Sequence, residues 1–188
     1  MSIETRLWLI RHAPVDGARG VIHGLDAPAN LGDAAAIAAL KARLPHQAFS
    51  VCSPARRTVE TAIALGLDPV KRSAFTEQDF GDWTGRRHDD LIAELGESYR
   101  VFWQSPATNR APGGESFADQ VARAGEGLAS LPAGDVILVA HSGTIRAVLA
   151  VALDLAPDAA LRFVIDPLSL TRIDRLENGW RVVAVNQR

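Results

Sequence analysis

The sequence has few cysteines, little net charge and no long apolar run, and each of these absences excludes a class of protein. It holds a single cysteine, Cys52, among 188 residues, so it cannot form an internal disulfide and a reducing, cytoplasmic setting is expected. A net charge of −2 predicts neither a basic surface for nucleic acid nor a polybasic membrane segment. No apolar run approaches the roughly 18 residues that span a membrane, and the first residues do not resemble a signal peptide. We therefore expect no nucleic-acid or membrane partner, and we leave the oligomeric state open.

Several kinds of chemistry lack their signature as well. The histidines form no closely spaced ligand pair, so neither a metal site nor a cofactor is expected; they are His12, His23, His46, His88 and His141. The nucleotide-binding pattern Gly-x4-Gly-Lys-[Ser/Thr] is absent. The loop of cysteine phosphatases would need an arginine six residues after Cys52, where this chain has Thr58. Cys52 is therefore expected to be a buried core residue.

Two short apolar runs, each ending in a histidine, organise the chain. Arg6–Ile10 leads into Arg11 and His12, and Val136–Ala140 leads into His141. Short continuous apolar runs are typical of strands buried on both faces of a sheet. The carboxyl edge of a parallel sheet is where ligands bind. We expect the two histidines to meet at this edge, beside a helix N-terminus that favours an anion.

The order of the elements predicts a three-layer α/β/α fold with a mostly parallel central sheet. Strands are expected near residues 6–11, 48–52, 69–75, 135–140, 168–174 and 180–185. Helices are expected near residues 33–44, 53–65, 87–104 (as two short helices), 115–131 and 145–153. Asn178-Gly179 is a strong turn signal and predicts a terminal hairpin. Residues 1–188 are expected to form one domain, with residues 86–114 as a helical insertion or lid.

Two further residues are expected near the same edge. Arg57 lies one turn into the helix after the second strand, which Ser53 as N-cap and Pro54 should start. Glu77 opens the loop after the third strand. A cluster of arginines and histidines suits a phosphoryl group, because guanidinium groups match its oxygens. A neutral imidazole can attack phosphorus, and a carboxyl can protonate the departing oxygen and then take a proton from water.

These residues fall within five motifs that together resemble the histidine phosphatase superfamily, the phosphoglycerate-mutase-like proteins. The motifs are Leu9-Ile10-Arg11-His12, Ser53-x3-Arg57-x3-Thr61-Ala62, Glu77-x2-Phe80-Gly81-x-Trp83-x-Gly85, Pro112-Gly113-Gly114-Glu115-Ser116 and His141-Ser142-Gly143-Thr144-Ile145-Arg146. The chain also resembles, more weakly, the α-ribazole phosphatases within this superfamily. The resemblance implies that His12 is the phosphorylated nucleophile and Glu77 the proton donor. It implies that Arg11, Arg57 and His141 bind phosphate and that no metal is needed.

The chain departs from the family pattern just after the nucleophile. Ala13 replaces a glycine, and Pro14-Val15 replaces an acidic residue and threonine. His23 stands where a glutamine is common, which makes it a weaker candidate for substrate binding. In the Glu77 loop, Asp79 and Asp82 are the other acids to consider, and His46 and His88 are expected at the surface.

The predicted function is a phosphatase that hydrolyses a small-molecule phosphomonoester through a phosphohistidine intermediate. One alternative is a phosphoglycerate-type phosphomutase. Only about 20 residues between Gly85 and Ser105 could build a lid over a mutase pocket, which favours hydrolysis. Another alternative is a catalytically silent module of the same fold that binds phosphate or a protein.

Overall fold

The computed structural model describes residues 3–188, and six strands in them form one sheet in the order β3-β2-β4-β1-β5-β6. The strands are β1 (Ile3–Arg11), β2 (Phe49–Cys52), β3 (Val70–Lys71), β4 (Gly134–Ala140), β5 (Leu170–Leu176) and β6 (Gly179–Gln187). Strands β3, β2, β4 and β1 run parallel, whereas β5 is antiparallel to both β1 and β6. The predictions of a mostly parallel sheet and a terminal hairpin are confirmed.

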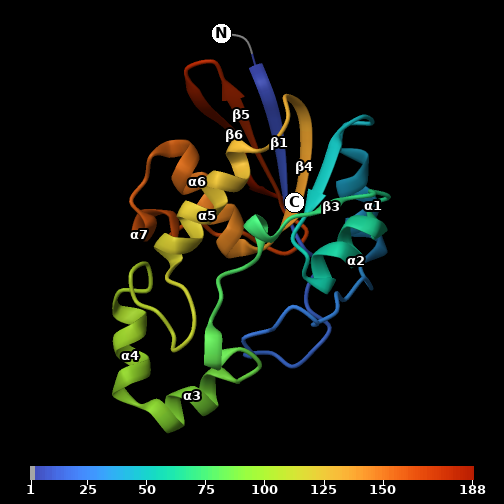
Figure 1. Cartoon of the computed structure of the whole chain (residues 1–188). Helices are drawn as coiled ribbons and strands as arrows, with labels where there is room; N and C mark the ends of the chain where they lie inside the picture. The colour runs from blue at the N-terminus through green and yellow to red at the C-terminus, as the bar shows by residue number, and fades with distance from the viewer. Residues whose placement is uncertain (1–2) are drawn as a thin grey trace.

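Helices cover both faces of this sheet and so make three layers. They are α1 (Ala34–Ala42), α2 (Arg56–Ala64), α3 (His88–Leu95), α4 (Glu97–Gln104), α5 (Phe117–Ala129), α6 (Ser142–Leu153) and α7 (Pro157–Ala160). Figure 1 shows α1 and α2 on one side of the sheet, α5, α6 and α7 on the other, and α3 and α4 beyond its carboxyl edge. None of the helices in residues 3–188 combines the length and apolarity needed to cross a membrane.

Alternation along the central strands divides the core between these two faces. Leu7 and Leu9 pack in one cluster with Phe117 of α5, whereas Ile10 packs in a second cluster with Leu40 of α1. Successive side chains of a strand point to opposite faces, so a strand covered on both faces needs apolar residues throughout. Each such side chain contributes about 1.5–3 kcal/mol when fully buried. This burial holds the end of β1, and therefore His12, in a fixed place.

Two predicted boundaries are wrong. The strand expected over residues 69–75 is limited to β3, after which Ser73–Phe75 forms a 3₁₀ turn. The helix expected to start at Ser53 begins at Arg56. The N-cap residue of this helix is Ala55. Ser53 Oγ accepts from Ala55 N over 3.2 Å and also lies 2.9 Å from His141 Nε2, so a tertiary contact is added to the local one.

Residues 86–114 contain α3 and α4, which pack around a small apolar cluster of their own. Leu91 and Phe102 are buried in this cluster together with Ile22 of the loop after β1. The backbone joins the same two regions, since Ile22 N donates to Arg86 O (2.9 Å) and Gly85 N donates to Ile22 O (2.7 Å). The insertion and the loop after β1 thus form a continuous rim beyond the sheet (Figure 1).

Candidate active site

The two strand-end histidines lie side by side at the carboxyl edge. β1 and β4 are parallel neighbours in which Arg11 pairs with Ala140, so His12 and His141 leave adjacent strands at the same level. Their ring centroids are 5.1 Å apart. Arg57, near the start of α2, donates from Nε to His12 Nε2 over 3.3 Å. The sequence prediction of which side chains meet here agrees with this geometry.

The hydrogen bonds of His12 determine which of its two ring nitrogens carries the proton. Nδ1 lies 2.5 Å from the carbonyl oxygen of Ala13, which can only accept, so Nδ1 carries the proton. Nε2 is then unprotonated, as the N–H of Arg57 directed at it also requires. Burial, with only 6% of the residue exposed, lowers the pKa of His12 well below its ordinary value, and the charges of His141 and Arg57 lower it further. The imidazole ring of His12 is therefore neutral at neutral pH.

His141 is the second buried imidazole of the site and precedes the first turn of α6. Its Nε2 pairs with Ser53 Oγ, whereas its Nδ1 is buried without a partner among the described residues. Burial lowers the pKa of His141 well below the ordinary value, followed by the charges of Arg57 and Arg11. A buried ring nitrogen that lacks a partner suits a ligand contact.

Three arginines bring positive charge to this edge, and backbone carbonyls anchor them. Arg11 Nη1 donates to Ile165 O over 2.5 Å, and Arg57 Nη1 donates to Gly24 O over 2.7 Å. Arg146, in α6, lines the same cavity. Burial lowers the pKa of all three, and the nearby charge of Glu77 acts in the opposite direction on each. The three cationic groups therefore gather around one acidic side chain.

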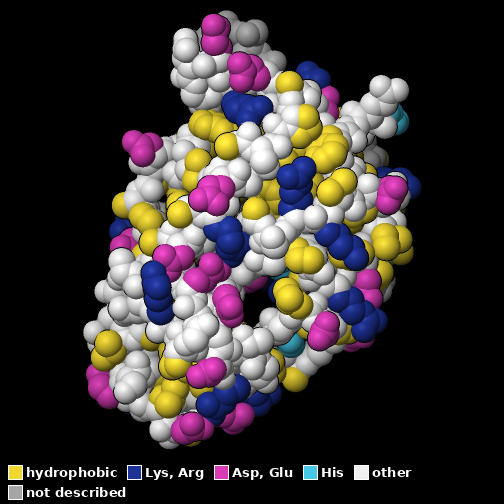
Figure 2. Space-filling view, in the orientation of Figure 1, with side chains coloured by type: hydrophobic (Ala, Val, Ile, Leu, Met, Phe, Trp, Pro, Cys, Tyr) yellow, Lys and Arg dark blue, Asp and Glu magenta, His cyan; other side chains and the backbone are white. Residues whose placement is uncertain are grey.

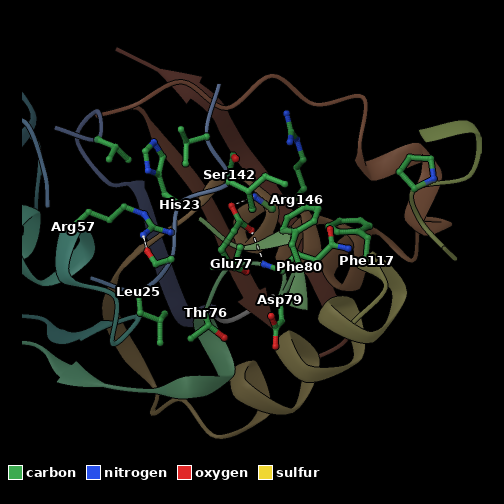
Figure 3. A pocket seen from close by; sticks show the side chains of 18 of the residues that line it. His23, Leu25, Arg57, Thr76, Glu77, Asp79, Phe80, Phe117, Ser142 and Arg146 are labelled. Carbon is green, nitrogen blue, oxygen red and sulfur yellow. Dashed lines mark hydrogen bonds between the residues drawn. The ribbon is translucent and has the colours of Figure 1, made fainter. Parts of the chain in front are cut away.

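The Glu77 carboxylate sits at the N-terminus of α6. Oε2 accepts from Gly143 N (3.1 Å), and Oε1 accepts from Gln78 N (3.1 Å) and Gln120 Nε2 (3.0 Å). A Cβ on Gly143 would lie 2.1 Å from Glu77 Oε1, so only glycine permits this approach. Figure 3 shows Glu77 directed into the pocket beside Ser142 and Arg146.

A cavity of about 930 Å³ opens in front of these groups. His23 lines it, as do the apolar and aromatic residues Val15, Val21, Ile22, Leu25, Phe80, Trp103, Phe117 and Leu161. His88 also lines the cavity, contrary to its expected place at the surface, because its Nδ1 bonds to the buried Tyr99 hydroxyl. In Figure 2 the molecule is hollowed between the loop after β1 and the insertion. The space is far larger than a phosphoryl group requires.

Two polar residues of this site were not predicted from the sequence. One is Arg146, which lies one turn into the helix that follows His141 and within the same motif. Gln120 lies on the buried face of α5 with Phe117 and Ala124, at helical spacing. A polar residue among apolar ones on that face was the signal that could have identified it.

The two buried histidines should make stability depend on pH. Their folded-state pKa lies below the ordinary value of 6.5, so the unfolded chain binds more protons as the pH falls below about 6.5. The free energy of unfolding should then fall by up to about 1.4 kcal/mol per pH unit for each histidine. Urea unfolding at pH 7 and pH 5 would measure the loss, which His141→Asn should reduce and the exposed His46→Asn should not. An unchanged pH dependence in His141→Asn would contradict this account.

The comparison with known sequences agrees with this site. The family model described as "Histidine phosphatase superfamily (branch 1)" matches residues 7–188. The adenosylcobalamin/α-ribazole phosphatase of Salmonella typhimurium is 27% identical over 195 residues, covering 97% of this chain and 96% of its own. A 2,3-bisphosphoglycerate-dependent phosphoglycerate mutase of Azorhizobium caulinodans is 32% identical over 123 residues, 60% of each chain. A bifunctional protein of Mycobacterium tuberculosis is 32% identical over 161 residues, but the chain spans only 44% of its length.

Solved structures share the whole fold. A structure described as a putative α-ribazole-5′-P phosphatase from Escherichia coli superposes with a TM-score of 0.89 at 24% identity, covering 98% of this chain and 97% of that one. A mycobacterial glucosyl-3-phosphoglycerate phosphatase superposes with a TM-score of 0.83 at 28% identity, covering 97% and 99%. With the family model matched from the first central strand to the last residue, the chain belongs to the histidine phosphatase superfamily.

Proposed function

We propose that the protein is a phosphatase that hydrolyses a phosphomonoester through a phosphohistidine, without a divalent metal. The observation that carries this proposal is the state of His12. Its Nε2 is unprotonated and buried, and it faces the guanidinium of Arg57 and the ring of His141. A neutral nucleophile surrounded by cationic groups is suited to attack an anionic phosphoryl group.

The proposed reaction has two steps. In the first, His12 Nε2 forms a bond to phosphorus, the ester P–O bond breaks, and Glu77 gives its proton to the departing alkoxide oxygen. In the second, the Glu77 carboxylate takes a proton from water as the water oxygen attacks phosphorus, and Nε2 departs with its electron pair. Arg11 and Arg57 would balance the charge on the phosphoryl oxygens, which is the task a metal performs in other phosphatases. The same carboxyl is thus acid in the first step and base in the second.

The charges on the cavity wall favour hydrolysis over a mutase reaction. A mutase acting on a bisphosphate or a phosphorylated acid must also hold a second anionic group. The arginines that line the described cavity are Arg11, Arg57 and Arg146, and all three lie near Glu77. Lysine does not occur among the described lining residues. The wall away from His12 therefore offers no cationic pair for a second anion.

The same wall indicates the kind of alcohol that the ester carries. Trp103 is 44% exposed although it is aromatic, and it lines the cavity together with His88 and Phe80. Aromatic surface left open to a cavity favours an apolar or flat group in the ligand. We propose an ester with an uncharged, ring-containing alcohol, and the name of the Salmonella relative makes α-ribazole 5′-phosphate the first to test.

The test is a hydrolysis assay on protein dialysed against a chelator. Release of inorganic phosphate from p-nitrophenyl phosphate and α-ribazole 5′-phosphate should persist without metal, and 3-phosphoglycerate should be a poor substrate. Activity that is lost on chelation and restored by a divalent ion would contradict the metal-independent reaction. Preferred conversion of 3-phosphoglycerate to its isomer would indicate the mutase. Binding of phosphate without turnover of any ester would indicate a silent module.

A further inference from the structure

Gln120 is a buried amide that contacts the carboxyl of Glu77. The residue is 0% exposed and lies on the face of α5 that packs on α6. Its Nε2 lies 3.0 Å from Glu77 Oε1, 3.2 Å from Thr76 O and 3.3 Å from Thr144 Oγ1. The reverse amide orientation would set its oxygen against a carboxylate and a carbonyl, so these neighbours fix the donor end toward Glu77.

With its nitrogen directed at Glu77, the Gln120 amide lowers the stability of the fold. The other end of the amide, Gln120 Oε1, is buried without a hydrogen-bond donor among the described residues. A buried carbonyl oxygen without a partner destabilises a protein, whereas an apolar side chain of similar size would fill the same space without this cost. The amide is therefore better explained by what its nitrogen does at Glu77 than by packing.

The donors around Glu77 are divided unequally between its two oxygens. Oε1 accepts from both Gln120 Nε2 and Gln78 N, whereas Gly143 N is the one donor to Oε2 within residues 3–188. A carboxyl oxygen that receives two N–H groups is a poor place for a proton, because a proton there would face two donors. The proton of the acid form then belongs on Oε2.

We propose that Gln120 is a positioning residue that keeps Oε1 of Glu77 as the acceptor and assigns the transferable proton to Oε2. The inference rests on the proposed function, in which Glu77 protonates the leaving alcohol. Gln120 touches neither the phosphoryl group nor His12, and it acts only through the orientation of the carboxyl. Thr144 Oγ1 lies 3.3 Å from the same amide nitrogen and donates to Thr76 O over 3.0 Å, whereas the contact to the Glu77 carboxyl is made by Gln120.

The experiment compares two esters in single-turnover phosphorylation of His12. Phenethyl phosphate has a poor leaving group that needs a proton, whereas p-nitrophenyl phosphate has a good one that hardly does. Gln120→Met keeps the side-chain length and removes the donor, and it should slow phosphorylation by phenethyl phosphate about 10- to 100-fold, because a misplaced catalytic group costs that much. Phosphorylation by p-nitrophenyl phosphate should change by less than about threefold. Gln120→Leu, which also lacks the donor and introduces no ionisable group, should show the same split.

Thr144→Val is the matched control, since it disturbs the same buried network and leaves the Gln120–Glu77 contact in place. It should affect both esters equally, and the thermal midpoints of all three variants should be recorded. Equal losses for the two esters in Gln120→Met and Gln120→Leu would show that Gln120 is only structural and would overturn the inference. A wild-type protein that forms no phosphohistidine with either ester would instead overturn the proposed function on which the inference rests.

Discussion

Replacing His12 by asparagine should lower turnover of every phosphate ester by a factor on the order of 10⁵, because removing a covalent nucleophile removes the reaction path that it provides. Of the two histidines at the sheet edge, only His12 has its Nδ1 proton held by a backbone carbonyl and its Nε2 facing a guanidinium. The Nε2 of His141 is hydrogen-bonded to Ser53 Oγ, 2.9 Å away, so His141 is not positioned to replace His12 as the nucleophile.

The measurement is steady-state phosphate release, together with a rapid-quench experiment on labelled substrate. Wild-type protein should yield a phosphoprotein that is stable in alkali and labile in acid, and His12→Asn should yield none. The exposed His46 provides the control, since His46→Asn should keep both turnover and the phosphoprotein. Turnover of His12→Asn at the wild-type rate would show that another group is the nucleophile.

The second large effect should come from Glu77, and it should depend on the leaving group. General acid catalysis is typically worth about 10²–10⁴-fold. Glu77→Gln should lose about that factor in phosphorylation of His12 by an alkyl phosphate, whose alkoxide has to be protonated as it departs. The loss should be much smaller with p-nitrophenyl phosphate. Single-turnover rates have to be compared, because the same carboxyl should also act as base when water attacks phosphohistidine.

Two other acids of the same loop provide the controls. Asp79 and Asp82 are both exposed, and Asp79 Oδ1 accepts a hydrogen bond from Gly81 N. Glu77, in contrast, is partly buried and accepts hydrogen bonds from three donors. Asp79→Asn and Asp82→Asn should keep the rates with both esters close to wild type. Equal losses for the two esters in Glu77→Gln would remove Glu77 as the acid, and an ester-dependent loss in Asp79→Asn would assign the role there.

The mostly parallel sheet and the meeting of the two histidines followed from the sequence alone. Arg6–Ile10 and Val136–Ala140 are apolar at every buried position, so both strands had to lie inside the sheet with their polar ends at one edge. Arg57 followed as well, since the helix after a parallel strand starts at the same edge. The loop after the third strand was expected at this edge too, but only the resemblance to a family could choose Glu77 over Asp79 and Asp82, because acidic residues in a loop carry no periodic signal.

Only the tertiary structure determined which hydrogen bonds hold the site residues and how large the cavity in front of them is. Two of the three donors to Glu77 come from Gly143 and Gln120, which are 66 and 43 residues away in the chain. The local pattern could place Ser53 at the start of a helix, where its Oγ accepts from Ala55 N, but it could not predict the second contact of this Oγ with His141. Hydrophobic periodicity in the sequence indicates which face of a helix or strand is buried. It does not indicate which atoms of two different helices or strands come into contact. Hydrogen bonds between distant segments depend on loop conformations and on approaches of about 3 Å, and only the packed chain determines those.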